Sequence, residues 1–543
     1  MMATTSGPHR DIDDSQTDNT STGTARPAAE ADEPTTRTSI TLSRQLNQEC
    51  DDLLSEIDAY SALVASTLRN PQLVEVRQFR TNVNAESKIL QKMGKQIQAA
   101  VETDPCSADP DTEIRLVHAL RSSNLPFYQA VWRITKGSCT GLVALGRRFY
   151  WEGESKATVR EKIKKVGSQP EKPPNKDKRK SAFVDIVADD GQEWVKVSTV
   201  SENRLLFEMA EKGWECDTDS EEEWSEDGKG RTVLQHSDDD EDDDEMELIK
   251  LARDLRRAAN STRVRYGHPR LRIVIPKIEE GSVPAIDSIL TQMRSFGVKV
   301  ECQQSLPEPT GTGLVHLLPQ PFKNFTSTLN VDCTILLALV SDLSHIKDIV
   351  PAFQLHPAIL RQIEVEKKKP LLPSELWPAM SARELVATSE AATRFREIVE
   401  TIGTDTEKTR TRLLLGEQPY ENLGHDGVLQ KFQELSDYPV PAEWKLPIRV
   451  VDAQPVITAA KERGDLPAVI HEVTKKLSDI NNSVFLYGWI TGLTTISSNR
   501  TIDKQIEATV ESNRQDDDDL KGPDVWICDT ARSLVGKDRD RKT

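Results

Sequence analysis

The chain has 543 residues, of which 37% are hydrophobic and 29% are charged, and its net charge is −18. This length exceeds what one hydrophobic core supports, so two or three domains with solvated segments between them are expected. No apolar stretch approaches the roughly 20 residues that span a bilayer, and no basic and apolar leader begins the chain. These two features predict an intracellular protein of the cytoplasm, the nucleus or both, without membrane association.

Neither the cysteines nor the histidines are spaced as metal or redox ligands. The seven cysteines form no Cys-x-x-Cys pair, and the nine histidines are dispersed along the chain. Zinc ribbons and redox dithiols need close cysteine pairs, so both are unsupported. The sequence also lacks a Walker loop, a dinucleotide fingerprint and a Ser/His/Asp nucleophile motif, which argues against a nucleotide cofactor.

The chain begins with a polar tail and a helical section. Residues 1–39 are rich in Thr, Ser, Asp and Pro and have no periodic apolar face, so we expect a disordered tail. Between residues 40–154, apolar residues recur at intervals of three and four, as at Leu46, Leu53 and Ile57. This spacing predicts a helical domain built as a bundle or a long hairpin.

A basic linker or insertion at 155–180 breaks the helical pattern. It contains ten Lys or Arg residues against three acids. The run Lys176–Lys180 is compatible with a nuclear-import signal, a phosphate-binding loop or a solvated linker, and the sequence leaves these interpretations open.

A β-hairpin is predicted at the start of the region 181–302. Two apolar, β-branched stretches, Ala182–Ala188 and Gln192–Val197, flank a short Asp-Gly turn, which is a hairpin signal. An acidic insertion at 215–247 then interrupts this region, and helical patterning resumes after it.

A βαβ unit is predicted next. Leu271–Pro276 and Val298–Cys302 are strand candidates, and Ser282–Phe296 between them is an amphipathic helix that ends at Gly297. This order predicts a parallel sheet with helices on its faces.

The residues 322–536 are predicted to form a separate α/β domain. Leu329–Val331 reads as a buried strand, followed by Asp332 and an apolar helix over Thr334–Leu343. Burying an unpaired carboxylate costs several kcal/mol, so Asp332 is either a metal ligand on an active-site floor or the cap of its helix. Further strand candidates are Ile448–Val451, Val484–Tyr487 and Val525–Cys528.

Four stretches of the chain resemble a eukaryotic family of uncharacterised proteins that is known by its domain of unknown function 1308. The hairpin Phe183–Lys196 is the most specific of them. The others are Leu329–Leu337, the Glu407 and Arg410 pair after Gly403, and Val484–Gly488. The resemblance spans roughly Ile40 to Gly536 and leaves out the basic and acidic insertions.

The resemblance implies a C-terminal domain similar to PIN-like nucleases. Those are three-layer α/β/α sandwiches with a parallel sheet, in which acids bind Mg²⁺ or Mn²⁺ and cleave RNA. Asp332 would supply the first acid and the metal ligand, and Glu390 and Glu407 would supply the second and third catalytic acids. Carboxylate oxygens suit these hard ions, and two ions about 4 Å apart stabilise the attacking and leaving oxygens of a phosphodiester.

The chain departs from this pattern at two positions. Relatives read Gly-Thr-Gly-Asp after the late strand, whereas this chain has Gly488-Trp-Ile-Thr491, so Thr491 stands at the position of an acid. Asp503 is a later acid that could compensate only with a different backbone. Arg394 stands where an active nuclease more often carries an acid. Loss of a carboxylate ligand weakens metal binding sharply.

Two hypotheses follow. The first is a non-catalytic or degenerate PIN-like interaction protein with an RNA or protein partner, in which Asp332 caps its helix and Glu407 and Arg410 form a surface ion pair. The second is a Mg²⁺- or Mn²⁺-dependent ribonuclease that uses the carboxylates around Asp332. No aromatic or Gly-rich pattern for RNA binding is visible, and the sequence leaves the oligomeric state open.

Overall fold

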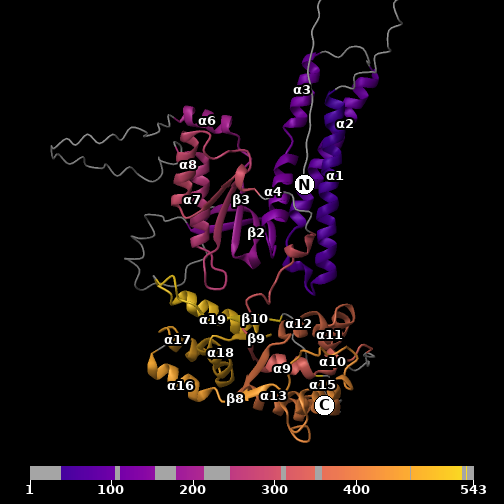
Figure 1. Ribbon diagram of the computed structural model, residues 1–543, viewed down its shortest axis with the longest axis vertical. Helices are drawn as coiled ribbons and strands as arrows, with labels where there is room; N and C mark the ends of the chain where they lie inside the picture. The colour runs from indigo at the N-terminus through magenta and orange to yellow at the C-terminus, as the bar shows by residue number, and fades with distance from the viewer. Residues whose placement is uncertain are drawn as a thin grey trace, which may run out of the picture.

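The computed structural model describes residues 38–103, 110–152, 179–212, 245–306, 313–348, 357–464, 466–515, 517–528 and 534. Most of the predicted tail and of the basic and acidic insertions lies outside these residues, while the last two residues expected in the tail, Thr38 and Ser39, begin a helix. The described part of the chain forms two units, each with a five-stranded sheet, stacked along the long axis of the molecule (Figure 1). The predicted α/β fold class is confirmed.

The N-terminal unit opens with α1 (Thr38–Thr67), α2 (Arg77–Thr103), α3 (Pro110–Arg121) and α4 (Leu125–Ser138). Along α1, buried side chains recur every three to four residues, among them Leu53, Ile57, Tyr60 and Val64. The periodic apolar spacing of the sequence is therefore a stripe that packs against α2 and α4.

The first sheet has the order β1 (Ala144–Glu152), β2 (Arg179–Ala188), β3 (Glu193–Val197), β4 (Arg270–Ile275) and β5 (Lys299–Cys302). Its first three strands pair antiparallel, and β3, β4 and β5 pair parallel. The predicted hairpin is β2–β3, and the predicted βαβ unit is β4, α8 (Pro284–Ser295) and β5. β1 lies inside the range that was expected to be helical.

Helices cover both faces of this sheet. On one face, α6 (Glu202–Glu211), α7 (Glu247–Asn260) and α8 share a buried cluster with the strands. On the other face, the helical hairpin and α4 share a second cluster that includes Leu145, Ile186 and Val195. The helical section and the strands of the hairpin region therefore pack into one common hydrophobic core.

The second sheet has the order β10 (Val525–Ile527), β9 (Thr494–Ser497), β6 (Thr328–Val331), β7 (Glu384–Thr388) and β8 (Arg449–Val451), and all its strands are parallel. Its helices are α9 (Cys333–Val340), α10 (Asp342–His345), α11 (Pro357–Lys368), α12 (Trp377–Met380), α13 (Ser389–Ile402), α14 (Asp405–Leu415), α15 (His425–Gln433), α16 (Gln454–Arg463), α17 (Ile470–Lys476), α18 (Asp479–Thr491) and α19 (Arg500–Ser512). This arrangement agrees with the predicted three-layer α/β/α domain.

Two local predictions in this domain were wrong. Val484–Tyr487 is not a strand but part of α18, and the strand follows it as β9. A short, fully apolar run does not distinguish a buried strand from a buried helix, because neither shows a polar face. The helix predicted over Thr334–Leu343 ends at Val340, since Ser341 adopts an extended conformation and caps α10 instead.

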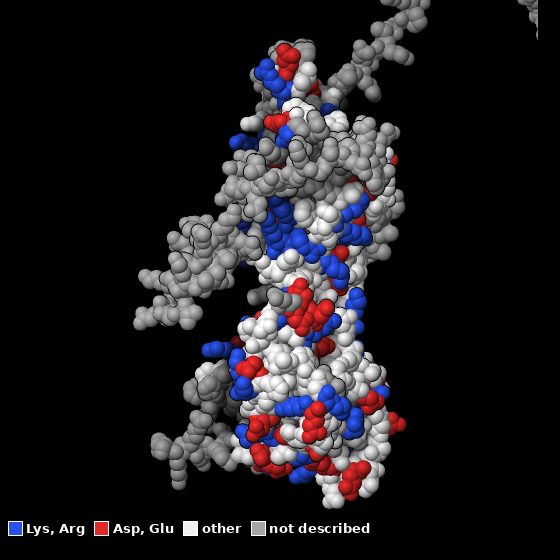
Figure 2. Space-filling model, turned by 90° about the vertical axis from the view of Figure 1, so that its left-hand side faces the viewer, with Lys and Arg blue, Asp and Glu red and all other residues white. Residues whose placement is uncertain are grey.

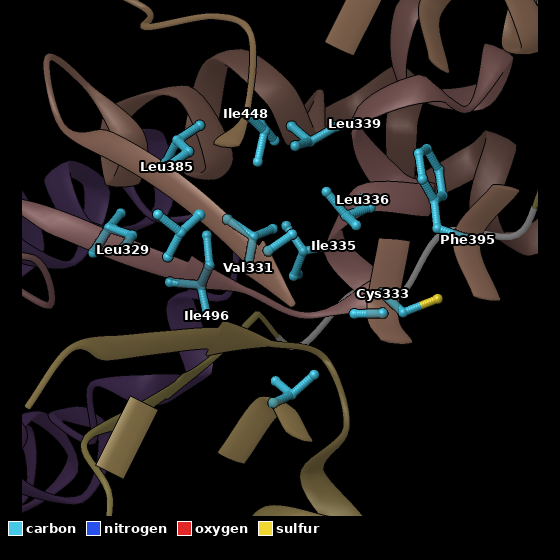
Figure 3. Packing of buried hydrophobic residues seen from close by; sticks show 14 of the residues in the cluster. Leu329, Val331, Cys333, Ile335, Leu336, Leu339, Leu385, Phe395, Ile448 and Ile496 are labelled. Atoms are coloured by element: carbon cyan, nitrogen blue, oxygen red, sulfur yellow. The ribbon is translucent and has the colours of Figure 1, made fainter. Parts of the chain in front are cut away.

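Apolar side chains of β6, β9 and α9 form the centre of the C-terminal core. Figure 3 shows Leu329 and Val331 of β6 beside Ile496 of β9, with Ile335 and Leu336 of α9 packed next to them. Each of these five side chains is at most 1% exposed. Full burial of such a side chain stabilises a fold by about 1.5–3 kcal/mol, so this packing fixes the strand-to-helix turn at Asp332.

Gly488 allows α18 to approach the sheet closely. A Cβ atom at this position would lie 2.1 Å from Thr495 Oγ1 and 3.2 Å from Asn330 Nδ2. Thr495 Oγ1 also accepts a hydrogen bond from Asn330 Nδ2 at 3.0 Å, so it cannot move freely. We expect Gly488→Ala to lower the free energy of unfolding by about 2 kcal/mol, although Gly→Ala normally stabilises a helix by up to about 1 kcal/mol.

Urea unfolding of Gly488→Ala and Gly427→Ala tests this expectation. Gly427 lies in α15, and the nearest atom to a Cβ there would be Cδ2, at the end of the flexible Leu423 side chain, at 3.3 Å. Gly427→Ala should therefore leave stability unchanged or raise it slightly. An increase in stability for both variants would show that α18 does not pack against Thr495 as described.

Among the residues that the structure describes, the turn between α1 and α2 and the loop after α7 both contact the C-terminal unit. Arg69, in the turn between α1 and α2, pairs with Glu366 of α11 at 3.2 Å. Tyr266, in the loop after α7, packs against the C-terminal core, where a Cβ atom on Gly522 would lie 2.2 Å from Tyr266 Cζ. The turn of the helical hairpin and the loop after α7 therefore join the units.

Charge is unevenly distributed over the molecular surface. On the face in Figure 2, Lys and Arg side chains gather on the N-terminal unit, whereas acids and bases are interspersed over the C-terminal domain. Among the helices that the structure describes, none combines the length and the apolar character needed to traverse a bilayer.

Candidate functional site

The carboxyl ends of β6 and β9 lie at the topological switch point of the parallel sheet, where the order of strand addition changes direction. From β6, the chain adds β7 and β8 on one side, and then β9 and β10 on the other. Open α/β sheets bind their ligands in the crevice at such a switch point. Asp332 directly follows β6, and Ser497 is the last residue of β9, so these residues define the candidate site.

Asp332 is held by hydroxyl groups in the protein interior. Asp332 is 3% exposed. Its Oδ2 accepts hydrogen bonds from Ser497 Oγ at 2.6 Å and from Thr334 Oγ1 at 2.7 Å. Burial raises the pKa of Asp332 above its ordinary value, and the two hydroxyls oppose this rise. Ser498 N–H donates to Thr334 Oγ1 at 3.1 Å, so the carboxylate joins the loops that follow β6 and β9.

Asp332 occupies the cap position of α9 but does not cap the helix with its side chain. Its carbonyl accepts hydrogen bonds from Ile335 N–H and Leu336 N–H at 3.0 and 3.1 Å, while no side-chain cap bond forms at this helix start. The carboxylate is held by the hydroxyls of Ser497 and Thr334, while the backbone N–H groups of Cys333 and Thr334 also act to lower its pKa.

Glu390 lies in the first turn of α13, after β7, at the same edge of the sheet. Its Oε1 accepts from Gln454 Nε2 at 3.0 Å, and its Oε2 accepts from Ser389 Oγ at 3.1 Å. Burial acts to raise the pKa of Glu390, but these hydrogen bonds outweigh it and hold the pKa below its ordinary value. The carboxylate is thus engaged by neutral donors.

Arg394 brings a cation to this edge. Burial and the neighbouring Asp332 raise the pKa of the Cys333 thiol to about 12, while Arg394 acts against this rise. Arg394 also pairs with Glu397 at 3.1 Å. Arg394 therefore brings a positive charge near Cys333, whereas the ribonuclease hypothesis expects acids at this edge.

Glu407 lies at the opposite end of α9 from Asp332. Its Oε1 accepts from Asp342 N–H at 3.0 Å and its Oε2 accepts from Thr404 N–H at 2.9 Å, which forms a capping box for α14. Asp342 follows the C-terminus of α9, an eight-residue helix about 12 Å long. The structure therefore does not bring Glu407 together with Asp332.

Glu407 and Arg410 are not a surface ion pair, because both are buried. Arg410 is 1% exposed, and its Nη1 donates to Asp342 Oδ1 at 2.6 Å and to the Val340 carbonyl at 2.9 Å. Its Nε donates to the Leu435 carbonyl at 3.1 Å. Arg410 thus links the end of α9, the start of α10 and the end of α15, and its ionic partner is Asp342.

Thr491 does not stand at the carboxyl edge of the sheet. It ends α18, where its Oγ1 donates to the Tyr487 carbonyl at 2.6 Å, and it precedes β9. At the edge of Asp332, β9 ends at Ser497 and is followed by Ser498. Asp503 lies in the first turn of α19, where burial and Glu507 raise its pKa to about 6.

The residues at this edge do not fit the two-metal site of the nuclease resemblance. Within the described ranges, no group of three or more His, Cys, Asp or Glu side chains is placed to hold a metal ion. Asp332 is surrounded by hydroxyls rather than by the carboxylates that Mg²⁺ and Mn²⁺ prefer.

A polar cavity of about 400 Å³ opens beside the switch point. It is lined by Asn70, Ser498, Arg500 and Ile527. Asn70 comes from the turn between α1 and α2, so the N-terminal unit forms one wall. Sequence reasoning missed these residues. The β-branched run Thr494–Ile496 after Gly492 was a signal for the strand β9, which ends at Ser497, but no local pattern indicated Asn70.

Comparison with known proteins finds a match to one protein family. No curated protein and no solved structure matches the chain. Over residues 329–419, which include β6, Asp332, α9 and α14, the chain matches the family described as protein of unknown function (DUF1308), and this match supports its resemblance to that family.

Proposed function

We propose that this protein is a non-catalytic interaction protein that has a PIN-like C-terminal domain and binds RNA without cleaving it. The observation that carries the proposal is the state of Asp332. It is buried, it accepts hydrogen bonds from Ser497 and Thr334, and the carboxylates expected beside it lie elsewhere or bind neutral donors. Such a carboxylate holds two loops together rather than a metal ion.

The surroundings of Asp332 support the same proposal. β9 ends at Ser497 and is followed by Ser498, so no acid stands at the end of this strand beside Asp332, and Arg394 contributes a positive charge near Cys333. Asn70 of the helical hairpin lines the cavity beside the switch point. A domain that keeps a crevice but lacks converging acids can bind a ligand without hydrolysing it.

A cleavage assay on the full chain tests this proposal. The end-labelled single-stranded RNA is incubated with the wild-type protein and with Asp332→Asn, in Mn²⁺ and in EDTA. We expect no difference in RNA decay among the four samples. Decay that needs Mn²⁺ and disappears in Asp332→Asn would contradict the proposal.

The Mg²⁺- or Mn²⁺-dependent ribonuclease remains the second candidate, because one observation favours it. Asp332 directly follows the central strand β6 at the switch point, which is where the nuclease resemblance places its first acid. The same assay separates the candidates, since only the ribonuclease requires Asp332 for cleavage.

A further inference from the structure

The outward face of the β1–β2 ribbon carries exposed aromatic and cationic side chains. Arg148 of β1 is directly opposite Phe183 of β2, and Tyr150 is opposite Ser181. Residues that are opposite each other, or two apart along a strand, point to the same face of an antiparallel pair. Tyr150 is 55% exposed and Phe183 is 40% exposed, so two aromatic side chains at diagonal positions of this face are open to solvent.

The other face of the same ribbon is ordinary protein core. Phe149 stacks on Trp194 with their ring centroids 3.7 Å apart, and Trp151 and Val184 are buried in the cluster that includes α7. On this buried face, β1 and β2 already pack apolar side chains into the core. The exposed rings of Tyr150 and Phe183 are therefore an addition that packing does not require.

Cations lie over the Phe183 ring. Arg148 Cζ is 5.8 Å and Lys196 Nζ is 5.2 Å from the ring centroid, and Lys196 also pairs with the buried Asp185 at 3.2 Å, which leaves Arg148 as the freer cation. Arg148 Nη1 also donates to Ser181 Oγ at 3.2 Å, which orients the guanidinium. Gly146, with φ of +79°, leaves room for the ring, because a Cβ atom there would lie 3.1 Å from Phe183 Cζ. The ring and its cations are thus held in place before any ligand arrives.

We propose that this surface, formed by Arg148, Tyr150, Ser181, Phe183 and Lys196, binds single-stranded RNA. The inference rests on the proposed function and names the surface through which RNA is recognised. Unpaired bases stack on exposed aromatic rings and arginine planes, and phosphates contact the neighbouring cations. Aromatic rings next to cations on an exposed sheet face can contact both the bases and the phosphates of single-stranded RNA.

The charge of the neighbouring chain is complementary to a phosphate backbone. β1 ends at Glu152 and β2 begins at Arg179, so the two strands of the surface are joined through the basic segment 155–180, with its ten Lys or Arg against three acids. Positive charge attached at this ribbon increases the attraction of a polyanion over long distances and makes binding dependent on salt. An apolar protein partner would gain nothing from this charge.

Fluorescence anisotropy of the full chain with a labelled, mixed-sequence RNA of about 12 nucleotides tests the proposal. We expect wild type to bind at low salt, and Tyr150→Ala combined with Phe183→Ala to weaken binding at least about tenfold, because each stacked base contributes substantially. Arg148→Gln should lower the dependence of binding on salt concentration. Tyr150→Phe combined with Phe183→Tyr keeps both rings and should restore binding.

The control is Phe207→Ala, which removes an aromatic ring that is 62% exposed on α6, with Arg204 above it, and should not change binding. Circular dichroism confirms that each variant is folded. If wild type binds RNA and the double alanine variant binds equally well, this surface is wrong while the proposed function stands. If wild type does not bind RNA, both the surface and the RNA assignment are contradicted. If it binds duplex RNA as tightly as single strands, the surface is contradicted while RNA binding stands.

Discussion

Replacing Arg410 with methionine is expected to lower the free energy of unfolding by about 3–5 kcal/mol, because it removes one partner of a buried ion pair. Arg410 and Asp342 are both buried, and Arg410 also donates to the carbonyls of Val340 and Leu435. Methionine fills a similar volume but leaves the Asp342 carboxylate and two carbonyl groups with fewer donors. Urea unfolding followed by tryptophan fluorescence measures the loss.

Arg412→Met is the matched control on the same helix. The Arg412 side chain is 45% exposed and pairs with Glu400 at 3.6 Å, so its loss should change stability by less than about 1 kcal/mol. Equal effects of the two substitutions would show that Arg410 does not connect α9, α10 and α15 from within the core.

The stability of the whole molecule is expected to fall as the pH rises through about 7, owing to Glu366. Its side chain is 4% exposed, and burial raises its pKa from 4.5 to about 7 despite the attraction of Arg69. Because the folded protein binds this proton more tightly than the unfolded chain, its stabilising effect is complete below pH 4.5 and is lost as the pH rises through about 7.

Glu366→Gln removes this titration. Between about pH 5 and pH 8, wild type should lose on the order of 3 kcal/mol relative to Glu366→Gln. Thermal unfolding of both proteins across this pH range gives the difference. Glu384→Gln, at a carboxylate with 60% side-chain exposure, is the control and should parallel wild type. Parallel curves for Glu366→Gln and wild type would refute the raised pKa.

Much of the fold could be predicted from local patterns. The β2–β3 hairpin has β-branched strands around an Asp-Gly turn, and the β4–α8–β5 unit has a helix stop at Gly297, so each carries its own signal. α18 was mistaken for a strand because its run Val484–Tyr487 is apolar on every side. Whether such a run becomes helix or strand depends on the segments that pack around it, and the local sequence does not show which segments these are.

The candidate site could be predicted only in part. Asp332 was evident as a lone acid after a buried strand, but its partners Thr334 and Ser497 depend on which strands become neighbours. Tyr150 and Phe183 were likewise missed as a pair, because they lie on different strands and meet only through the register of β1 with β2. Contacts between distant segments arise from strand pairing, and no local pattern encodes them.

The central claim is that Asp332 is a structural acceptor for two hydroxyls and not a metal ligand. Thermal unfolding of the full chain in increasing Mn²⁺, for wild type and Asp332→Asn, tests it most directly. A metal bound at one hundred times its dissociation constant would raise the melting temperature by roughly 5 °C or more. We expect no such rise and the same response in both proteins. A saturable rise in wild type that is absent in Asp332→Asn would contradict the claim.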